Sequence, residues 1–164
     1  MAAYDPSEWS DLFVAAAGAS AALAGLVFVA VSINLDRILK FPGLPDRALQ
    51  TVLMLLSVVV VSLLGLFPGQ SRVALGLELT SVAVFFAVFI GRAGVRSRPP
   101  AASPAHWVVG RVMVVAFATV PFLIGGISVL AGGGGGLYWT AAGIICTIAA
   151  GVSNAWVLLV EILR

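Results

Sequence analysis

Five long runs of apolar residues divide this chain, separated by short segments that are polar or rich in glycine and proline. The runs cover roughly residues 12–35, 49–67, 73–90, 107–130 and 137–163. At ~1.5 Å per residue, a helix of about 20 residues crosses the ~30 Å hydrocarbon core of a bilayer. The pattern therefore predicts an all-α fold: one membrane domain over residues 1–164, built as a polytopic bundle of five transmembrane helices.

The breaks between the runs also predict local structure. Asp5 and Pro6 have the residue types of a helix cap and first helical position. Pro68-Gly69 ends the second run, and so short a connection makes spans two and three antiparallel neighbours. Pro121 predicts a kink in the fourth span. The five glycines at 132–136 predict a flexible link before the last span.

Small residues dominate the first span, where ten of the eleven positions 15–25 are Ala, Gly or Ser. Within lipid, close packing drives helix association, and small residues allow backbones to approach. The last span carries a matching row at four-residue spacing. We therefore expect the first span to be the central helix, enclosed by the others and packed on the last span. The candidate packing residues are Gly18, Ala22, Gly25, Gly143, Thr147 and Gly151.

Composition supports the membrane class, because 61% of the residues are hydrophobic and 10% are charged, against about 25% charged in soluble domains. Eight of the nine basic residues are Arg, which, with the Ala, Gly and Val content, is typical of a protein from a GC-rich bacterial genome. Eight basic residues fall in or near the predicted cytoplasmic loops 36–48 and 91–106 or at the tail, and Arg72 lies opposite. The positive-inside rule then places the N-terminus outside and the C-terminus in the cytoplasm, in the inner membrane. The eight are Arg37, Lys40, Arg47, Arg92, Arg96, Arg98, Arg111 and Arg164.

Glu78 is the one acidic residue well inside a predicted span. It is a candidate proton- or cation-binding carboxyl, with Ser62 and Ser20 at the same depth as candidate partners. The alternative is a structural carboxyl bonded to a neighbouring hydroxyl group.

A second polar group is predicted near the cytoplasmic end of the bundle. Arg111 shares that level with amide and hydroxyl side chains, which need hydrogen-bond partners in lipid. They could bind the helices together, or form a binding site or gate to which Arg111 supplies charge. Arg111 could equally extend to anionic headgroups. The cluster is Ser32, Asn34, Gln50, Arg111 and Asn154.

Several function classes find no support in the sequence. One His106 and one Cys146 cannot supply the three or four ligands of an all-protein metal site. The glycine run lacks the GK[ST] of a phosphate loop, and no Ser–His–Asp or Cys–His set shares one depth. We therefore expect no enzyme activity and no cofactor. The loop arginines predict contact with anionic lipid, and without aromatic platforms they argue against nucleic-acid binding.

Residues 9–14, 18–36, 44–48, 68–70 and 75–78 resemble segments of an uncharacterised family of small bacterial multi-span inner-membrane proteins, often labelled "modulator of FtsH protease". The match spans roughly residues 9–80. Asn34, Pro68, Gln70 and Glu78 fall in the recurring segments, and the resemblance implies no catalytic residues. The first span also resembles the pore helix of Orai-type calcium channels, although Ser32 or Ile33 stands where that pore has an acid.

Two functions follow as expectations. The first is a non-enzymatic membrane protein that acts through helix packing with itself, as a homo-oligomer, or with a membrane-protein partner. The alternative is an oligomeric ion channel or small transporter that uses Glu78 and the inner polar cluster.

Overall fold

The computed structural model describes the backbone of residues 2–97 and 104–163, and the side chains of residues 3–97 and 108–160. Arg98, His106 and Arg164, named above, lie outside the described side chains. Within the described residues all regular secondary structure is helical, and five helices are long and apolar enough to span a membrane. The elements are η1 (Ala2–Tyr4), η2 (Pro6–Trp9), α1 (Ser10–Ile33), α2 (Leu35–Ile38), α3 (Leu44–Gly65), α4 (Arg72–Arg96), α5 (Pro104–Ala131) and α6 (Leu137–Leu163).

The five predicted runs correspond to α1, α3, α4, α5 and α6, so this part of the prediction is confirmed. Two boundaries differ. Helix α3 begins at Leu44 rather than near residue 49. Pro45 lies in its first turn, where a backbone N–H would have no acceptor within the helix, so the proline does not interrupt it. Helix α4 continues to Arg96 rather than ending near residue 90. Both extensions carry the helices past the apolar runs into the basic segments.

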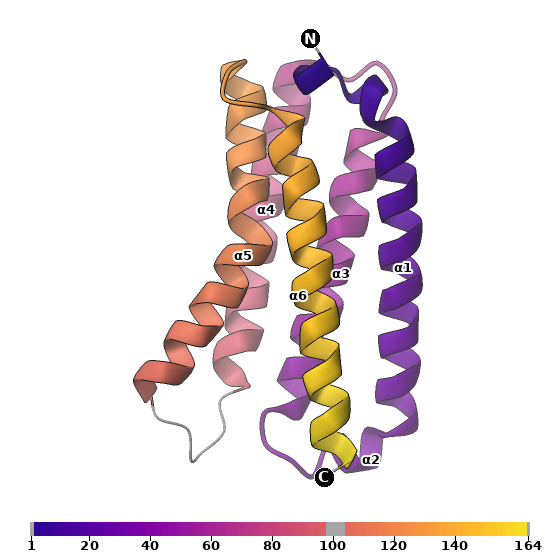
Figure 1. The fold of residues 1–164 in the computed structure, drawn as a ribbon, viewed down its shortest axis with the longest axis vertical. Coiled ribbons are helices and arrows are strands. Elements are labelled where there is room, and N and C mark those ends of the chain that lie inside the picture. The colour runs from indigo at the N-terminus through magenta and orange to yellow at the C-terminus, as the bar shows by residue number, and fades with distance from the viewer. Residues whose placement is uncertain (1, 98–103, 164) are drawn as a thin grey trace.

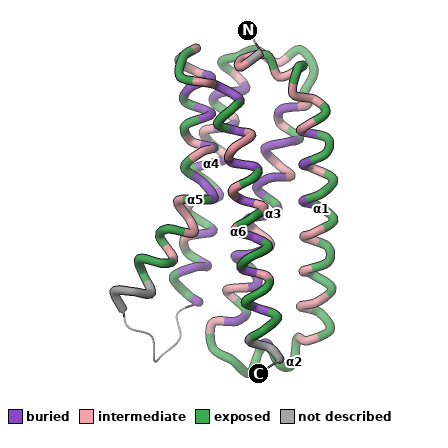
Figure 2. Tube along the Cα trace, viewed as in Figure 1, coloured by how far each residue is buried: buried purple, intermediate pink, exposed green. Residues whose placement is uncertain are grey.

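Helix α1 lies at the edge of the bundle and not at its centre, which corrects the expectation drawn from its small residues (Figure 1). It packs along α3 and touches α6 far less. In its most apolar stretch 17% of the residues are buried, against 56% for α3 (Figure 2). Small residues show that a helix can be approached closely, but they do not specify which helix approaches. The central position belongs to α3, which contacts α1, α4 and α6.

Glycines in α4 and α5 set the closest helix contacts. A Cβ atom at Gly126 would lie 2.8 Å from the backbone nitrogen of Thr80 on α4, and one at Gly125 would lie 3.1 Å from that of Thr140 on α6. Helix α5 is therefore held between α4 and α6 at backbone contact distance in this half of the bundle. Its other half diverges from α6 below Pro121, as the kink prediction implies (Figure 1).

The glycine link between α5 and α6 is a hydrogen-bonded turn rather than a flexible link. Gly132, Gly134, Gly135 and Gly136 all have positive φ angles, which L residues rarely adopt. The Ser128 hydroxyl accepts from the Gly136 N–H at 2.7 Å and donates to the Gly133 carbonyl. The run of glycines is thus needed for a left-handed backbone path.

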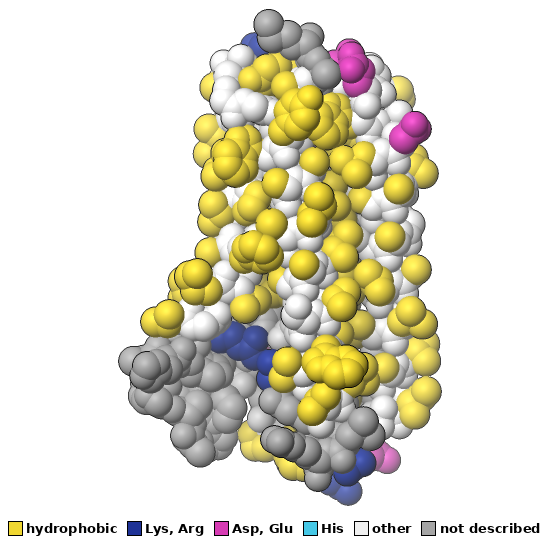
Figure 3. All heavy atoms as spheres, viewed as in Figure 1, with side chains coloured by type: hydrophobic (Ala, Val, Ile, Leu, Met, Phe, Trp, Pro, Cys, Tyr) yellow, Lys and Arg dark blue, Asp and Glu magenta, His cyan; other side chains and the backbone are white. Residues whose placement is uncertain are grey.

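The two ends of the bundle differ in charge. On the face that Figure 3 shows, acidic side chains lie mostly near the N-terminus and basic ones mostly toward the other end, although each end also shows a side chain of the opposite charge. Asp5 caps η2 by accepting from the Ser7 N–H at 3.0 Å, as the sequence predicts. Its pKa is lowered by the hydrogen bond from the Ser7 hydroxyl and then by that backbone N–H.

Candidate functional site

Three polar residues of α3 share one face near the basic end of the bundle. Arg47, Gln50 and Thr51 are spaced by three and four residues, so their side chains project on the same side of the helix. Gln50 and Thr51 are fully buried, and Arg47 is half-buried. Their position follows from the early start of α3, which brings Arg47 into the helix rather than leaving it in the preceding loop.

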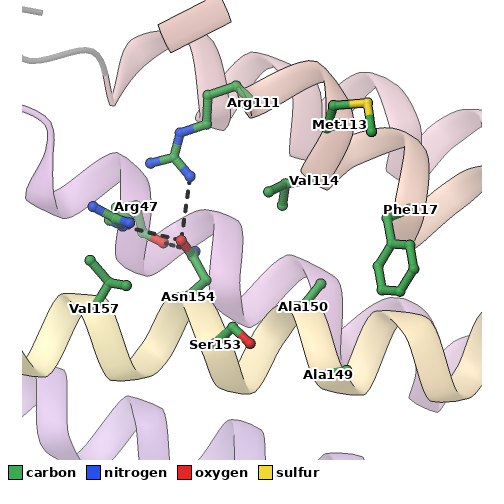
Figure 4. A pocket seen from close by; sticks show the side chains of 10 residues that line it. All are labelled: Arg47, Arg111, Met113, Val114, Phe117, Ala149, Ala150, Ser153, Asn154 and Val157. Atoms are coloured by element: carbon green, nitrogen blue, oxygen red, sulfur yellow. Dashed lines mark hydrogen bonds between the residues drawn. The ribbon is translucent and has the colours of Figure 1, made fainter. Parts of the chain in front are cut away.

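Asn154 of α6 connects this face to the rest of the bundle. Its Oδ1 atom accepts from Arg47 Nε at 3.1 Å and from Arg111 Nη1 at 3.3 Å (Figure 4). Its Nδ2 atom donates to Thr51 Oγ1 at 2.7 Å and to the Arg47 carbonyl at 3.4 Å. Both ends of the amide are therefore used, as a buried amide in lipid requires.

Arg111 of α5 completes the connection. The same Nη1 atom donates to Gln50 Oε1 at 3.0 Å, and Gln50 Nε2 lies 3.4 Å from the Ile90 carbonyl of α4. Gly94 leaves the room for this amide, because a Cβ there would stand 2.8 Å from Gln50 Nε2. Four helices, α3 to α6, thus meet in one network of hydrogen bonds.

A cavity of about 440 Å³ lies beside the network. Arg47, Arg111 and Asn154 lie toward one end, together with Val157, while Phe117 and Ala149 lie toward the other (Figure 4). Arg47 and Arg111 bring two guanidinium groups to one end of the cavity, and Phe117 makes the other end apolar. The cavity is lined by Arg47, Arg111, Met113, Val114, Phe117, Ala149, Ala150, Ser153, Asn154 and Val157.

The structure joins three members of the predicted inner cluster, Gln50, Arg111 and Asn154. It does not join the other two. The Ser32 hydroxyl donates to the Phe28 carbonyl at 2.8 Å, and Asn34 Nδ2 donates to the Ala30 carbonyl at 2.9 Å. Both acceptors belong to the side chain's own helix, one turn earlier. Because α1 is peripheral, its polar residues bond to their own backbone instead of reaching the cluster.

Glu78 is half-buried and accepts a hydrogen bond from Gln70 Nε2. This contact links the turn after α3 to the second turn of α4. The hydroxyls of Ser20 and Ser62 are buried and have no hydrogen-bond partner within the described residues. Within the described part of the chain no hydrogen bond joins them to Glu78, so the predicted set of three is not assembled by direct contacts.

The predicted packing residues fall into two groups. Those of α6 are buried: Gly143 faces Phe122 of α5, Thr147 Oγ1 donates to the Ala118 carbonyl at 2.7 Å, and Gly151 faces Leu55 of α3. Their neighbours are therefore α5 and α3, and not the expected first span. Those of α1, namely Gly18, Ala22 and Gly25, are exposed.

No protein-family model, curated protein or solved structure matches this chain.

Two site residues were missed by sequence reasoning. Arg47 falls in the predicted loop 36–48, whereas the structure has it in the first turns of α3; its spacing from Gln50 and Thr51 is the signal in the sequence that identifies it. Gly94 gave no signal in sequence, because its role depends on the amide that approaches it from α3.

Proposed function

We propose that the protein is a non-enzymatic, multi-pass protein of the bacterial inner membrane that acts through packing of α1 against a second copy of itself or another membrane protein. Its N-terminus would lie outside and its C-terminus in the cytoplasm, in agreement with the basic residues. The observation that carries the proposal is the small-residue face of α1, which the protomer leaves uncovered.

This face has the spacing of a helix-packing stripe. Gly18, Ala22 and Gly25 are four and three residues apart, so they lie above one another on one side of α1. A Cβ atom at Gly18 or Gly25 would have no atom within 4 Å, so neither glycine is explained by contacts inside the protomer. Glycine in a helix has a cost of about 1 kcal/mol relative to alanine. A neighbouring helix that approaches this face closely would offset that cost.

Both resemblances noted in the sequence agree with this proposal. The segments over residues 9–80 are similar to those of small bacterial inner-membrane proteins. The Orai-like pattern of α1 is similar to a helix that lines the axis of an oligomer. A second copy is the partner tested first, because it requires no other protein.

The test is the oligomeric state of purified protein in nanodiscs, with Gly18→Leu and Gly25→Leu compared with wild type. We expect wild type to associate and both variants to dissociate, because a leucine prevents close approach of a second helix. Gly110→Leu is the matched control, since Gly110 of α5 is also exposed with no atom within 4 Å of a Cβ. Wild-type protein that is monomeric without a partner, or variants that associate as wild type does, would refute self-packing.

Gly151→Leu is not suited to this test. A Cβ there already meets Leu55 Cδ2 at 3.1 Å within the protomer. The substitution would therefore disturb folding before it could report on assembly.

A further inference from the structure

A second cavity, of about 280 Å³, lies at the N-terminal end of the bundle, between the start of η2 and the turn that joins α3 to α4. We propose that this N-terminal cavity binds a partly hydrated Mg²⁺ ion, with the Asp5 carboxylate as the charged ligand and backbone carbonyls at the end of α3 as neutral ones. No residue of the α1 packing face lines the cavity, so the proposal does not depend on self-packing.

Asp5 supplies the negative charge. The Ser7 hydroxyl and the Ser7 N–H both donate to its Oδ1 atom, at 2.6 and 3.0 Å, so the Oδ2 atom is available to a ligand. These two bonds lower the pKa of the carboxyl, which is therefore ionised at neutral pH. Hard divalent cations prefer carboxylate and carbonyl oxygens as ligands. An ionised carboxylate in the wall of a cavity thus favours this class of ion.

The C-terminal end of α3 supplies further oxygens. Gly65, Leu66 and Phe67 line the cavity, and within the described residues their carbonyls accept no backbone hydrogen bond. The last carbonyls of a helix have no partner inside it, and the helix dipole gives this end a negative partial charge. A cation is therefore favoured here by the helix end as well as by the carboxylate.

Gln70 indicates a bound ion or water independently of these charges. It lines the cavity, and its Oε1 atom is buried without a hydrogen-bond donor in the described part of the chain. Its Nε2 atom donates to Glu78, which holds the amide in place. A buried acceptor without a partner is one of the signs of an ion or an ordered water beside it. A Mg²⁺ ion that keeps some of its waters can provide either.

Among the described residues, no basic side chain lines the cavity to neutralise its charge. Arg72, the first residue of α4, follows the same turn but extends elsewhere. A Cβ atom at Gly132 would lie 2.6 Å from Arg72 Nη1, so the guanidinium group lies against the turn between α5 and α6. The negative charge of the cavity is therefore left for a ligand.

The volume and the ligand types select a hydrated ion. Mg²⁺ gives up its waters reluctantly and is usually held by one or two carboxylates rather than by a complete cage of protein ligands. An octahedral shell of six waters, at about 30 Å³ each, needs about 180 Å³. That shell fits within the cavity of about 280 Å³. Zn²⁺ does not fit the lining, because it prefers His and Cys ligands and neither type is present there.

The site can be tested with Mn²⁺, which shares the octahedral oxygen coordination of Mg²⁺. Purified full-length protein in a neutral detergent is titrated with Mn²⁺ at constant ionic strength, and the free ion is measured by electron paramagnetic resonance. We expect one ion to bind per chain, with a Kd on the order of 10⁻³ M or lower, as in oxygen-ligand sites of few charges. MgCl₂ should displace it. Absence of saturable binding, or displacement by KCl at the same ionic strength, would overturn the proposal.

Asp5→Asn is the decisive variant, because Asn is also an N-cap acceptor and only the charge is removed. It should weaken Mn²⁺ binding about tenfold or more. Asp11→Asn is the matched control: it removes an exposed charge from the first turn of α1, outside the cavity lining, and should change binding less than about twofold. Equal losses in the two variants would show only a general attraction to this acidic end and would overturn the proposal.

Ser10→Leu tests the cavity itself. Ser10 lies in the cavity lining, so a leucine there fills part of the volume without changing the charge. Mn²⁺ binding should weaken, and normal binding would place the ion elsewhere and refute the assignment. Thermal unfolding of each variant checks that it is folded, and Asp5→Asn keeps the test valid if Ser10→Leu is not.

Discussion

Asn154 is the residue on which the inner network depends, so replacing it with leucine is the sharpest test of that network. Leucine has a similar volume but no hydrogen-bonding group. The substitution removes two bonds from guanidinium groups, at 3.1 and 3.3 Å, and the 2.7 Å bond to Thr51 Oγ1. The fourth bond, at 3.4 Å, is at the edge of hydrogen-bond geometry and adds little.

The magnitude follows from the kind of bond. Side-chain hydrogen bonds between transmembrane helices contribute about 0.6 kcal/mol on average and about 1.7 at most, and bonds to charged groups are roughly twice as strong as neutral ones. Two bonds of about 1 kcal/mol and one of about 0.6 give an expected loss of about 2–3 kcal/mol for Asn154→Leu.

The assay is reversible unfolding in mixed micelles by titration with sodium dodecyl sulfate, followed by far-ultraviolet circular dichroism. Asn34→Leu is the matched control, because the Asn34 side chain donates to the Ala30 carbonyl of its own helix and is half-buried. Asn34→Leu should lower the free energy of unfolding by less than about 0.6 kcal/mol. Thr51→Val should cost less in the Asn154→Leu background than alone, since the shared bond is already absent and only the bond from Thr51 Oγ1 to the Arg47 carbonyl remains to be lost. Equal losses for the two asparagines, or full additivity with Thr51→Val, would refute the reasoning.

Two further predictions concern other parts of the bundle. Gly126→Ala should lower the free energy of unfolding by about 1–3 kcal/mol, because its Cβ would stand 2.8 Å from the Thr80 nitrogen, while Gly91→Ala, with open space, should be neutral or slightly stabilising in the same titration. Ser7→Ala should raise the pKa of the Asp5 carboxyl toward its ordinary value of about 3.9, as measured by carbon-13 NMR titration. Because the pKa of Asp5 is lowered in the folded protein, this carboxyl stabilises the fold at a pH above the ordinary value. That stabilisation is lost as the pH falls through the folded pKa.

The number and type of the helices could be predicted from sequence because hydrophobic length is a property of each run by itself. The arrangement could not, because it depends on which helix meets which. The small residues of α1 and α6 look equivalent in sequence, yet Gly143 faces Phe122 while Gly18 faces no atom within 4 Å. What distinguishes them is the bulky side chain of another helix, and sequence spacing does not pair helices.

The inner cluster shows the same limit at the level of side chains. Shared depth correctly brought Gln50, Arg111 and Asn154 together, since all three must reach partners within a thin layer of the bilayer. The same criterion of depth includes Asn34, but a polar side chain near a helix end can instead donate a hydrogen bond to the backbone carbonyl one turn earlier, as Asn34 does to Ala30. A central helix makes cross-helix bonds and a peripheral one bonds to itself, so the role of each amide followed from the position of its helix.

Pro121 divides the bundle into a closely packed part and a part that contains the cavity. On one side, Gly125 and Gly126 bring α5 to backbone contact with both neighbours. On the other, Thr147 Oγ1 still bonds the Ala118 carbonyl, and beyond that point α5 leaves α6 and the cavity opens. Close packing and the cavity therefore lie on successive turns of one helix. A larger side chain at Ala149, which lines the cavity, should therefore be accommodated, whereas a single methyl group at Gly126 should lower the free energy of unfolding by about 1–3 kcal/mol.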